Sequence, residues 1–277
     1  MPALSIVLPC YNEADRIAQS LAMLREWFPP DAQIVVIDDG SRDGTAAAAR
    51  QFAEAHGDAG IQVHVRGENG GKGASIRTAI PLATGREVLF VDADLVFGRG
   101  SIEQVLRGLR HGDLAIANRR HAASQYSVPV RLFGFLYRRH LVGLTFNVLV
   151  RAAFGLPHRD TQCGLKAFRR EALERLGDWL TIDGFAVDVE ILLAARTLGL
   201  RVIEVPVVVS YETAASSVRL IRSATAMSAD LLHLFAGRLT GRFRARAITT
   251  GGATSPPPPP APSPAPLDPP QAPSARS

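Results

Sequence analysis

The chain has 277 residues, of which 47% are apolar and 21% are charged, with a net charge of +5. This length suits one large domain with a sizeable core. Two cysteines cannot form a disulfide framework or a CxxC zinc or redox site, and the modest positive charge does not favour nucleic acid as a partner. Only two of the 31 basic residues, Lys72 and Lys166, are lysines. Lysine at these positions therefore does not reflect average composition.

Neither secretion nor a membrane span is predicted. The N-terminus lacks the charged start and long apolar stretch of a signal peptide. The longest strongly apolar segment, 141–150, is about half as long as a membrane span. Together with the few cysteines, this leads us to expect a cytoplasmic protein.

Residues 1–250 are predicted to form the globular domain, and residues 251–277 a separate tail. Eleven of the 19 prolines fall in the tail. Such a segment cannot bury a core, so we expect it to be disordered and locally polyproline II. It is either an inert extension or a docking segment that uses its Pro-x-x-Pro spacings.

The globular part alternates short apolar runs with helical patterns. The runs 34–37 and 88–91 are continuously apolar, as in a parallel sheet that is covered on both faces. The alternation predicts an α/β fold with an open, mostly parallel sheet and helices on both faces. In chain order the predicted elements are strand 4–9, helix 13–27, strand 34–38, helix 43–56 (capped by Asp43), strand 62–65, helix 73–83, strand 88–92, helix 101–110, strand 114–118, helix 130–153, strand 202–209 and helix 217–236.

Polar motifs follow four of the predicted strands, where ligands of such sheets bind. The motifs are Pro9-Cys10-Tyr11-Asn12-Glu13, Asp38-Asp39-Gly40-Ser41 with Asp43-Gly44-Thr45, Asn69-Gly70-Gly71-Lys72-Gly73, and Asp92-Ala93-Asp94. They place acids, glycines and one lysine at one edge of the sheet.

Asp92 and Asp94 are the most specific feature of this edge. At positions i and i+2 of an extended segment, their side chains point to the same face. Two carboxylates so close repel each other unless a cation joins them. Hard oxygen ligands suit Mg²⁺ or Mn²⁺, with phosphate oxygens completing the shell. A chance Asp-x-Asp in a turn is the alternative, but the position after a buried strand favours the metal.

The next two motifs suggest contacts with a nucleotide. Asp38 and Asp39 could accept hydrogen bonds from a base or ribose, and the compatible alternative is a turn with Gly40 at positive φ. The loop around Lys72 resembles a phosphate cradle. It is not a P-loop, because Arg66 and Gly73 occupy positions where that motif needs Gly and Ser or Thr. Lys72 could balance the charge of a diphosphate.

Two further motifs lie in the second half, at 160–166 and 184–190. In a helix Asp188 and Glu190 would not share a face, so we expect them to differ in role. Cys163 is interpreted as a small packed residue rather than a nucleophile.

Basic residues cluster on the two long predicted helices. Four of them lie on or beside the first, and residues 216–246 hold six arginines and one acid. The apolar residues of 217–236 repeat at helical spacing, which suits a basic amphipathic helix on an anionic membrane surface. The alternative is a helix that packs on the sheet and leaves its arginines in solvent. The four arginines of the first cluster are Arg131, Arg138, Arg139 and Arg151.

Taken together, the four strand-end motifs resemble those of family 2 glycosyltransferases of GT-A fold. The segments 160–168, 185–190 and 204–207 resemble the dolichyl-phosphate β-glucosyltransferase branch of that family, and the resemblance covers residues 3–212. Two positions depart from the pattern. Val96 replaces a polar neighbour of the metal site, and Ser216-Ser217-Val218-Arg219 stands where the branch has Gly-Ser-Lys.

The resemblance implies roles for individual residues. Those expected to bind the nucleotide sugar are Pro9, Tyr11, Glu13, Asp38, Asp39, Lys72, Asp92 and Ala93. Asp92 and Asp94 would hold Mg²⁺ or Mn²⁺ on the donor diphosphate. Arg119, which follows Asn118 where the family has Ser-Arg, would face the acceptor phosphate, as would Arg139 and Arg219. The residues expected to act in catalysis are Asp94, Arg119, Arg139 and Asp188.

The implied activity is a metal-dependent, inverting transfer of a hexose, glucose from UDP-glucose, to polyprenyl or dolichyl phosphate at the inner face of the membrane. A phosphate monoester is largely dianionic near neutrality, so this acceptor needs little help from a base. One alternative uses GDP-mannose with the same lipid. Another transfers to a sugar hydroxyl with Asp188 as base. An alternative from a different class is a non-catalytic nucleotide-sugar sensor whose tail docks partners.

Overall fold

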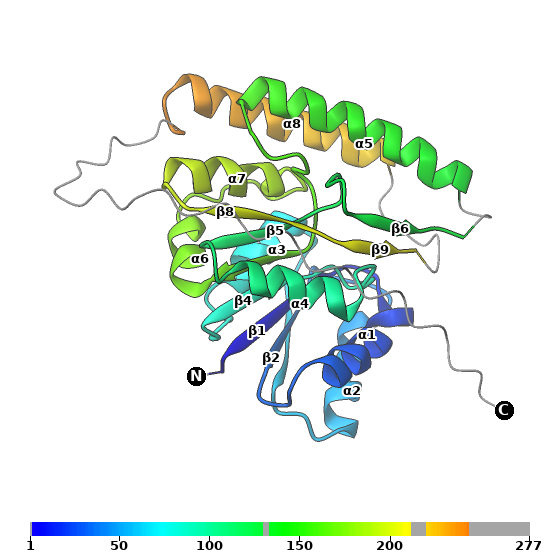
Figure 1. The fold of residues 1–277 in the computed structure, drawn as a ribbon. Helices are drawn as coiled ribbons and strands as arrows, with labels where there is room; N and C mark the ends of the chain where they lie inside the picture. Colours follow the sequence, from blue (N-terminus) through cyan, green and yellow to red (C-terminus); the bar gives the residue numbers. More distant parts are fainter. Residues whose placement is uncertain (1, 130–132, 212–219, 244–277) are drawn as a thin grey trace.

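A seven-stranded sheet forms the centre of the protein, in a computed structural model that describes residues 2–129, 133–211 and 220–243 (Figure 1). Side chains are described for these residues except 133–142, 220–226 and 228. The strand order is β3-β2-β1-β4-β7-β5-β8, and only β7 is antiparallel to its neighbours. The strands are β1 (Leu4–Cys10), β2 (Gln33–Asp38), β3 (Ile61–Val65), β4 (Glu87–Phe90), β5 (Leu114–Asn118), β7 (Lys166–Arg169) and β8 (Val202–Pro206).

Helices cover both faces of this sheet, and a small parallel ribbon of two strands lies beside it (Figure 1). The helices are α1 (Ala14–Trp27), α2 (Thr45–Ala55), α3 (Lys72–Ala79), α4 (Arg99–Gly108), α5 (Phe133–Phe154), α6 (Arg170–Gly177), α7 (Val187–Thr197) and α8 (Leu220–Leu239). The ribbon consists of β6 (Gln125–Ser127) and β9 (Val208–Ser210). The predicted fold class is therefore confirmed.

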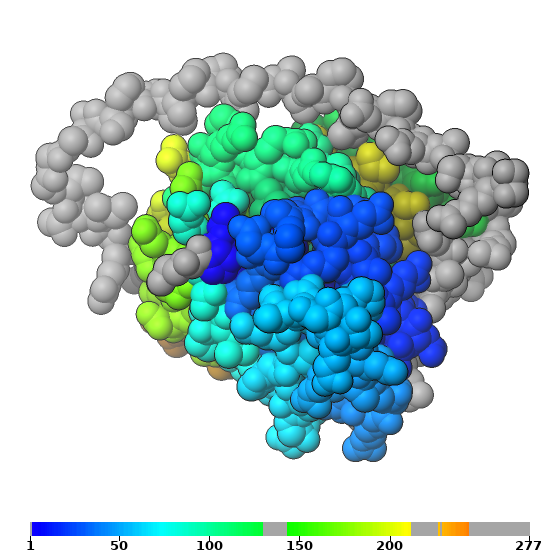
Figure 2. Space-filling model, turned by 90° about the horizontal axis from the view of Figure 1, so that it is seen from below, coloured from blue at the N-terminus to red at the C-terminus, as the bar shows by residue number. Residues whose placement is uncertain are grey.

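The central strands send alternate side chains into two separate cores. Ile6 and Leu8 of β1 pack with α1, α2 and α4 on one face, whereas Val7 packs with residues of α3, α6 and α7 on the other. Every residue of β2 is buried, as a strand covered on both faces requires. The first helices and strands form one continuous surface, blue to cyan, when the molecule is seen from the side opposite α5 and α8 (Figure 2).

Two predicted elements differ from those observed, and several observed elements were not predicted. The helix predicted at 73–83 ends at Ala79, shortly before Pro81, which has no amide to continue the helical hydrogen bonds. The strand predicted at 202–209 is two strands, because the chain leaves the main sheet after Pro206 and pairs with β6. Strand β7 was not predicted, since four residues are too few for a periodic signal.

The start of α2 also differs from the prediction. Its N-cap is Gly44, with φ of 92°, and not Asp43. The Asp43 carboxylate accepts hydrogen bonds from the Thr45 amide and hydroxyl, and from the Ala14 amide at the start of α1. One aspartate thus serves the beginnings of two helices, which a prediction for each helix alone could not find.

The C-terminal helix was predicted at 217–236, and α8 is described from Leu220 to Leu239. The residues before Leu220, among them Arg219, lie outside the described residues. The predicted boundary at residue 250 and the tail at 251–277 also lie outside them, so both stay predictions.

Candidate active site

The topology brings the predicted motifs to one edge of the sheet. Strands β2, β1 and β4 are parallel neighbours, and Cys10 at the end of β1 is in register with Asp38 at the end of β2. Because β7 is antiparallel, its first residue, Lys166, pairs with Phe90 at the end of β4. The segment 160–165 therefore reaches the same edge as Asp92, although it precedes a strand rather than following one.

The first two motifs are joined by hydrogen bonds from backbone to side chain. The amides of Asn12 and Glu13 donate to the Ser41 and Thr45 hydroxyls at 2.9 and 2.8 Å. These acceptors serve amides at the start of α1 that have no partner within the helix. Next to them Tyr11 remains 38% exposed. The two loops thus form one rigid rim with an aromatic side chain accessible on it.

Asp38 and Asp39 are both buried, and each organises a loop. The Asp38 carboxylate accepts the Ser41 amide at 2.9 Å, and Gly40 has φ of 72°, so the predicted turn is confirmed. The Asp39 carboxylate forms an ion pair with Arg66 and accepts the Gly71 amide at 2.6 Å. Their contacts with a nucleotide remain a prediction.

The segment that carries Asp92 and Asp94 is a turn, and the expectation of an extended segment is wrong. Strand β4 ends at Phe90, and the Leu95 amide donates to the Asp92 carbonyl at 3.1 Å. The Ala93 carbonyl points inward and accepts the Ser20 hydroxyl at 2.6 Å. Asp92 is nearly half exposed and Asp94 is exposed. The metal prediction therefore depends on the surroundings of these carboxylates and not on strand periodicity.

Gly164 lies directly against Asp92. A Cβ atom at Gly164 would stand 1.9 Å from Asp92 Oδ2, closer than any real contact. The motif at 160–166 thus leaves room for the carboxylate of another motif, and any side chain at this position would displace that carboxylate. The sequence carried no signal for this contact, because it joins residues from two predicted motifs.

Both lysines of the chain contact Asp188, at the start of α7. Lys166 Nζ lies 2.6 Å from Asp188 Oδ1, and Lys72 Nζ lies 3.2 Å from Asp188 Oδ2. Lys72 Nζ is also 3.5 Å from Asp92 Oδ1. Burial opposes ionisation of Asp188, but the two ammonium groups outweigh it and lower the pKa of its carboxyl. Lys72 and Lys166, the two lysines of the sequence, thus belong to one ionic cluster around Asp188.

Glu190 has a different role from Asp188, as predicted. Its side chain is fully buried, and its carboxylate accepts the amides of Thr181 and Ile182, both at 2.9 Å. Arg242, which follows α8, reaches the same carboxylate at 3.2 Å. Glu190 therefore holds the loop before α7 and fastens the C-terminal segment to it.

The residues at Asp92 fit a divalent metal such as Mg²⁺ or Mn²⁺. Asp92 and Asp94 offer hard carboxylate oxygens, and the Lys72 ammonium stands beside Asp92 as a substitute cation. Within the described part of the chain, no group of three or more His, Cys, Asp or Glu side chains could hold a metal. Oxygens of a bound diphosphate and of water would therefore complete the coordination.

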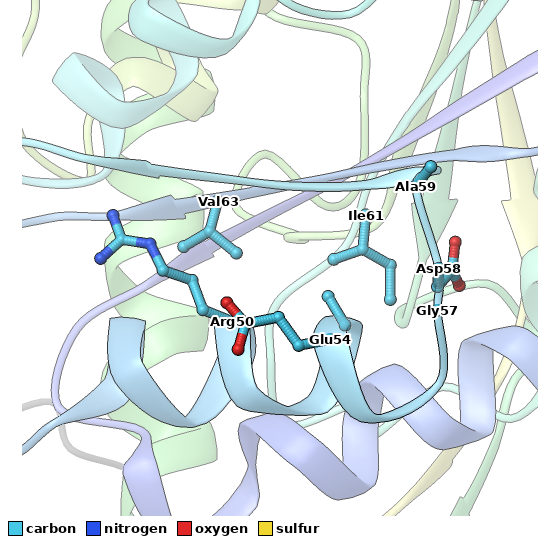
Figure 3. Close-up of a pocket in the computed structure, with 8 residues that line it drawn as sticks. Arg50, Glu54, Gly57, Asp58, Ala59, Ile61 and Val63 are labelled. Carbon is cyan, nitrogen blue, oxygen red and sulfur yellow. The ribbon is translucent and has the colours of Figure 1, made fainter.

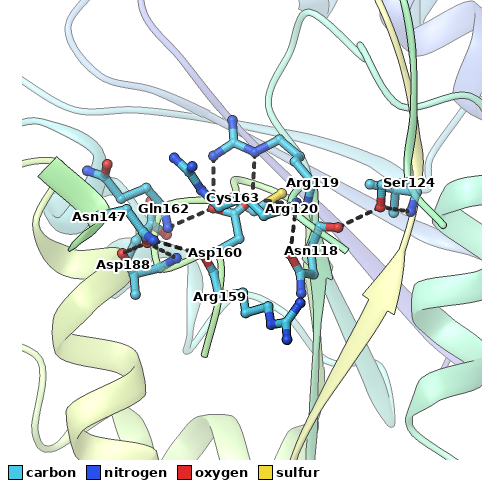
Figure 4. A network of polar contacts seen from close by, with 12 residues as sticks. Asn118, Arg119, Arg120, Ser124, Asn147, Arg159, Asp160, Gln162, Cys163 and Asp188 are labelled. Carbon is cyan, nitrogen blue, oxygen red and sulfur yellow. Dashed lines mark hydrogen bonds and ion pairs between the residues drawn. The ribbon is translucent and has the colours of Figure 1, made fainter. Parts of the chain in front are cut away.

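Arg119, after β5, is held by the buried Asp160 (Figure 4). Arg119 Nε and Nη2 donate to the two carboxylate oxygens at 2.7 and 3.0 Å, and the Arg119 amide donates to Oδ2 at 3.1 Å. Burial opposes ionisation of both groups, but their mutual attraction lowers the pKa of Asp160 and raises that of Arg119. The sequence predicted Arg119 as a site residue, but it did not predict that Asp160 fixes the orientation of the Arg119 guanidinium group.

Cys163 is buried beside this pair, as predicted for a packed residue. Burial raises the pKa of its thiol to about 11, and the thiol rather than the nucleophilic thiolate is then present at neutral pH. Of the other predicted residues, Arg139 lies on α5 but its side chain is outside the described residues, and all of Arg219 is outside them.

Helices α5 and α8 lie side by side across the outer side of α7 (Figure 1). One side of α8 packs inward through Leu234, which is fully buried. The large apolar side chains exposed on the pair are Leu144, Val148, Leu149, Leu232, Phe235 and Leu239. No described helix is long and apolar enough to cross a bilayer. Arg238 and Arg242, which follow the predicted helix 217–236, bind the Ala153 and Trp179 carbonyls. The side chains of Arg219 and Arg222, the arginines within that helix, lie outside the described residues, so its basic face stays a prediction.

A shallow pocket of about 400 Å³ lies between α2 and β3 (Figure 3). Its lining includes Arg50, Glu54 and Ile61. Since Ile61 begins β3, the pocket lies at the amino end of that strand, away from the motifs, and contains none of the predicted site residues.

Comparisons with known protein sequences agree with the family that the motifs resemble. The profile of glycosyl transferase family 2 matches residues 5–177. A dolichyl-phosphate β-glucosyltransferase of Homo sapiens is 32% identical over 256 residues, which cover 87% of this chain and 77% of that protein. The protein of that name from Dictyostelium discoideum is also 32% identical, over 74% of this chain and 65% of its own length. This chain thus spans slightly less than two thirds of the Dictyostelium relative.

Among solved structures, a glucosyl-3-phosphoglycerate synthase from Mycobacterium tuberculosis has a similar fold. Its complex with Mn²⁺, UDP and glucosyl-3-phosphoglycerate superposes with a TM-score of 0.59 at 20% identity, over 85% of this chain and 79% of that one. At this identity the similarity concerns the fold.

Proposed function

Because the chain belongs to glycosyltransferase family 2 and has its GT-A fold, we propose that it transfers a hexose from a nucleotide sugar to a polyprenyl phosphate. The family, the fold and the glycosyltransferase activity predicted from the motifs are confirmed. The relatives named dolichyl-phosphate β-glucosyltransferase support glucose as the sugar and a lipid phosphate as the acceptor. UDP-glucose is the donor that we propose. Inversion at the anomeric carbon and the metal on the donor diphosphate belong to the same proposal.

The choice of acceptor rests on the Asp188 carboxylate, which is paired with two lysines. A sugar hydroxyl must lose a proton to a base during transfer. Asp188 is 4% exposed, both its oxygens are bound by lysines, and its pKa is lowered, which makes it a poor base. A phosphate monoester is largely dianionic at neutral pH and needs no base. The ionic cluster therefore favours a phosphate acceptor over the hydroxyl acceptor.

In this proposal the protein orients two phosphorylated substrates. Arg119, fixed in plane by Asp160, faces the acceptor phosphate together with Arg139 and Arg219, since a guanidinium binds phosphate oxygens in a bidentate way. A metal bound at Asp92 and Asp94 would act as a Lewis acid on the diphosphate.

The remaining predicted residues surround the donor. Lys72 lies beside Asp92, where it could add positive charge near the diphosphate. The residues that we propose to contact the nucleotide are Pro9, Tyr11, Glu13, Asp38, Asp39 and Ala93.

The exposed apolar side of α5 and α8 supports contact with a membrane surface, and we propose that this surface is the inner face. Leu232 and Leu239 are 71% and 69% exposed, and burial of such side chains in the headgroup and acyl boundary would be favourable. This contact would bring the site to an acceptor that is dissolved in lipid.

Supplying labelled donors and several acceptors in parallel tests the proposal. We expect label from UDP-glucose, rather than from GDP-mannose or UDP-GlcNAc, to enter the organic phase with a short polyprenyl phosphate and Mn²⁺ or Mg²⁺. Asp94→Asn should abolish this transfer, as EDTA should in the unaltered protein. Label on free glycans alone would contradict the lipid acceptor. Donor binding without turnover on any acceptor would favour the sensor.

A further inference from the structure

The Lys72 ammonium stands between two carboxylates from different parts of the chain. It is 3.5 Å from Asp92 Oδ1 and 3.2 Å from Asp188 Oδ2. Asp188 is buried, whereas the Asp92 side chain is 46% exposed. Lys72 thus shields a carboxylate that is open to solvent on its other side.

The backbone holds Lys72 in this place. Gly71 has φ of 93°, and the Gly73 amide donates to the Asp183 carbonyl at 2.7 Å, so the start of α3 is fixed against the loop before α7. Lys166 already occupies Asp188 Oδ1 and also binds the Cys163 carbonyl. Asp188 Oδ2 is the oxygen left for Lys72, and the rest of the ammonium faces Asp92.

Binding of a metal ion in the absence of nucleotide is unfavourable at this site. Asp92 is already neutralised by Lys72, and a divalent cation at Asp92 would stand close to an ammonium that the backbone and Asp188 keep there. A donor diphosphate carries negative charge that both cations can share. The described residues also offer too few carboxylates to complete a metal shell by themselves.

We propose that Lys72 makes metal binding depend on the nucleotide. In the free protein it is the counterion of Asp92, and it suppresses binding of Mn²⁺ or Mg²⁺ alone. With a diphosphate bound, the Lys72 ammonium would share its charge with the phosphate oxygens, and Asp92 and Asp94 would hold the metal. Lys72 is therefore a positioning residue that couples two ligands, and this inference rests on the proposed metal role of Asp92 and Asp94.

Titration of the full chain with Mn²⁺ tests the coupling without any acceptor. Free Mn²⁺ is followed by electron paramagnetic resonance, with and without UDP or GDP. For the unaltered protein we expect Mn²⁺ affinity to rise about 100-fold or more when the matching nucleotide is present. In Lys72→Met, the affinity for Mn²⁺ alone should rise about tenfold, and the gain from nucleotide should shrink.

Two variants serve as controls. Lys72→Arg keeps the charge and should keep most of the coupling. Arg77→Met removes a positive charge from the same helix, where Arg77 pairs with Asp183, and should bind Mn²⁺ like the unaltered protein. A circular dichroism spectrum of each variant checks the fold.

The outcomes separate this inference from the proposed function. Equal or weaker binding of Mn²⁺ alone by Lys72→Met would overturn the role of Lys72 while leaving the metal site intact. Absence of Mn²⁺ binding in every variant, even with nucleotide, would instead remove the metal from the proposed function. An equal gain in Arg77→Met would reduce the effect to general electrostatics and would also overturn the inference.

Discussion

Because residue 164 is glycine, the Asp92 carboxylate can lie directly against the backbone at that position. A Cβ atom there would overlap Asp92 Oδ2, so the Asp92 carboxylate would have to leave its present position. Gly164 lies just before the central strand β7, and Asp92 belongs to the turn that Ala93 and Leu95 fix by hydrogen bonds. Any substitution at Gly164 would therefore move Asp92.

We expect Gly164→Ala to reduce transfer about 100-fold or more while the protein stays folded. The added methyl group displaces Asp92 from its place at the proposed metal and donor site, and displacements of about 1 Å have effects of this size. Initial rates and a melting curve measure the two effects. Gly100→Ala is the control, because a Cβ there meets nothing within 4 Å. Normal transfer by Gly164→Ala would show that Asp92 need not stand where it does.

Asp188 connects residue chemistry to stability. Asp188→Asn leaves two lysines without their shared carboxylate, and loss of one partner of a buried ion pair costs about 3 kcal/mol of unfolding free energy. The pKa of Asp188 is lowered in the folded protein. Its contribution is thus complete above the ordinary carboxyl pKa of about 3.9 and is lost as pH falls through the lower folded value.

Urea unfolding of the unaltered protein and Asp188→Asn at several pH values measures this contribution. The difference between them should be full at pH 7 and should shrink below about pH 4. Glu174→Gln, which breaks an exposed pair with Arg170 on one helix, should cost less than about 1 kcal/mol. A difference that does not change with pH would contradict the ionic role of Asp188.

At the scale of elements, the pair α5 and α8 has two unlike sides. Leu234 is buried against the body of the protein, whereas Leu232 and Leu239 are exposed. Arg242 binds Glu190 and the Trp179 carbonyl, so α8 is fastened at its C-terminal end to the loop before α7. A surface docked through these helices would therefore be mechanically connected to the site.

The double variant Leu232→Glu, Leu239→Glu should weaken binding to vesicles that contain anionic lipid by at least about tenfold. Burial of these two leucine side chains in the lipid would contribute more than about 1.4 kcal/mol, the free energy that corresponds to a tenfold change in affinity. Cosedimentation measures the effect. Val65→Glu is the matched control, since Val65 is 42% exposed on the edge strand β3, far from both helices. Equal loss in both variants would point to a general effect of charge.

Across the whole molecule, the strands and helices of the first half were predictable. Continuous apolar runs such as 34–37 indicate strands buried on both faces, and these strands hold that position in the sheet. Parallel order then places the polar ends of β1, β2 and β4 at one edge. The antiparallel strand β7 was not predictable, because its four residues pair through the backbone with strands far away in the chain.

The sequence alone determined the family, the fold class and the identity of most candidate site residues, since local apolar patterns and short polar motifs carry that information. Tertiary structure decided which side chains face one another. Lys72 and Asp188 are 116 positions apart and Arg119 and Asp160 are 41 apart. Such pairs depend on how the strands and helices are packed, and ion pairing acts through space and not along the chain. For that reason the two lysines were conspicuous in the composition, but only the folded protein joins both to Asp188.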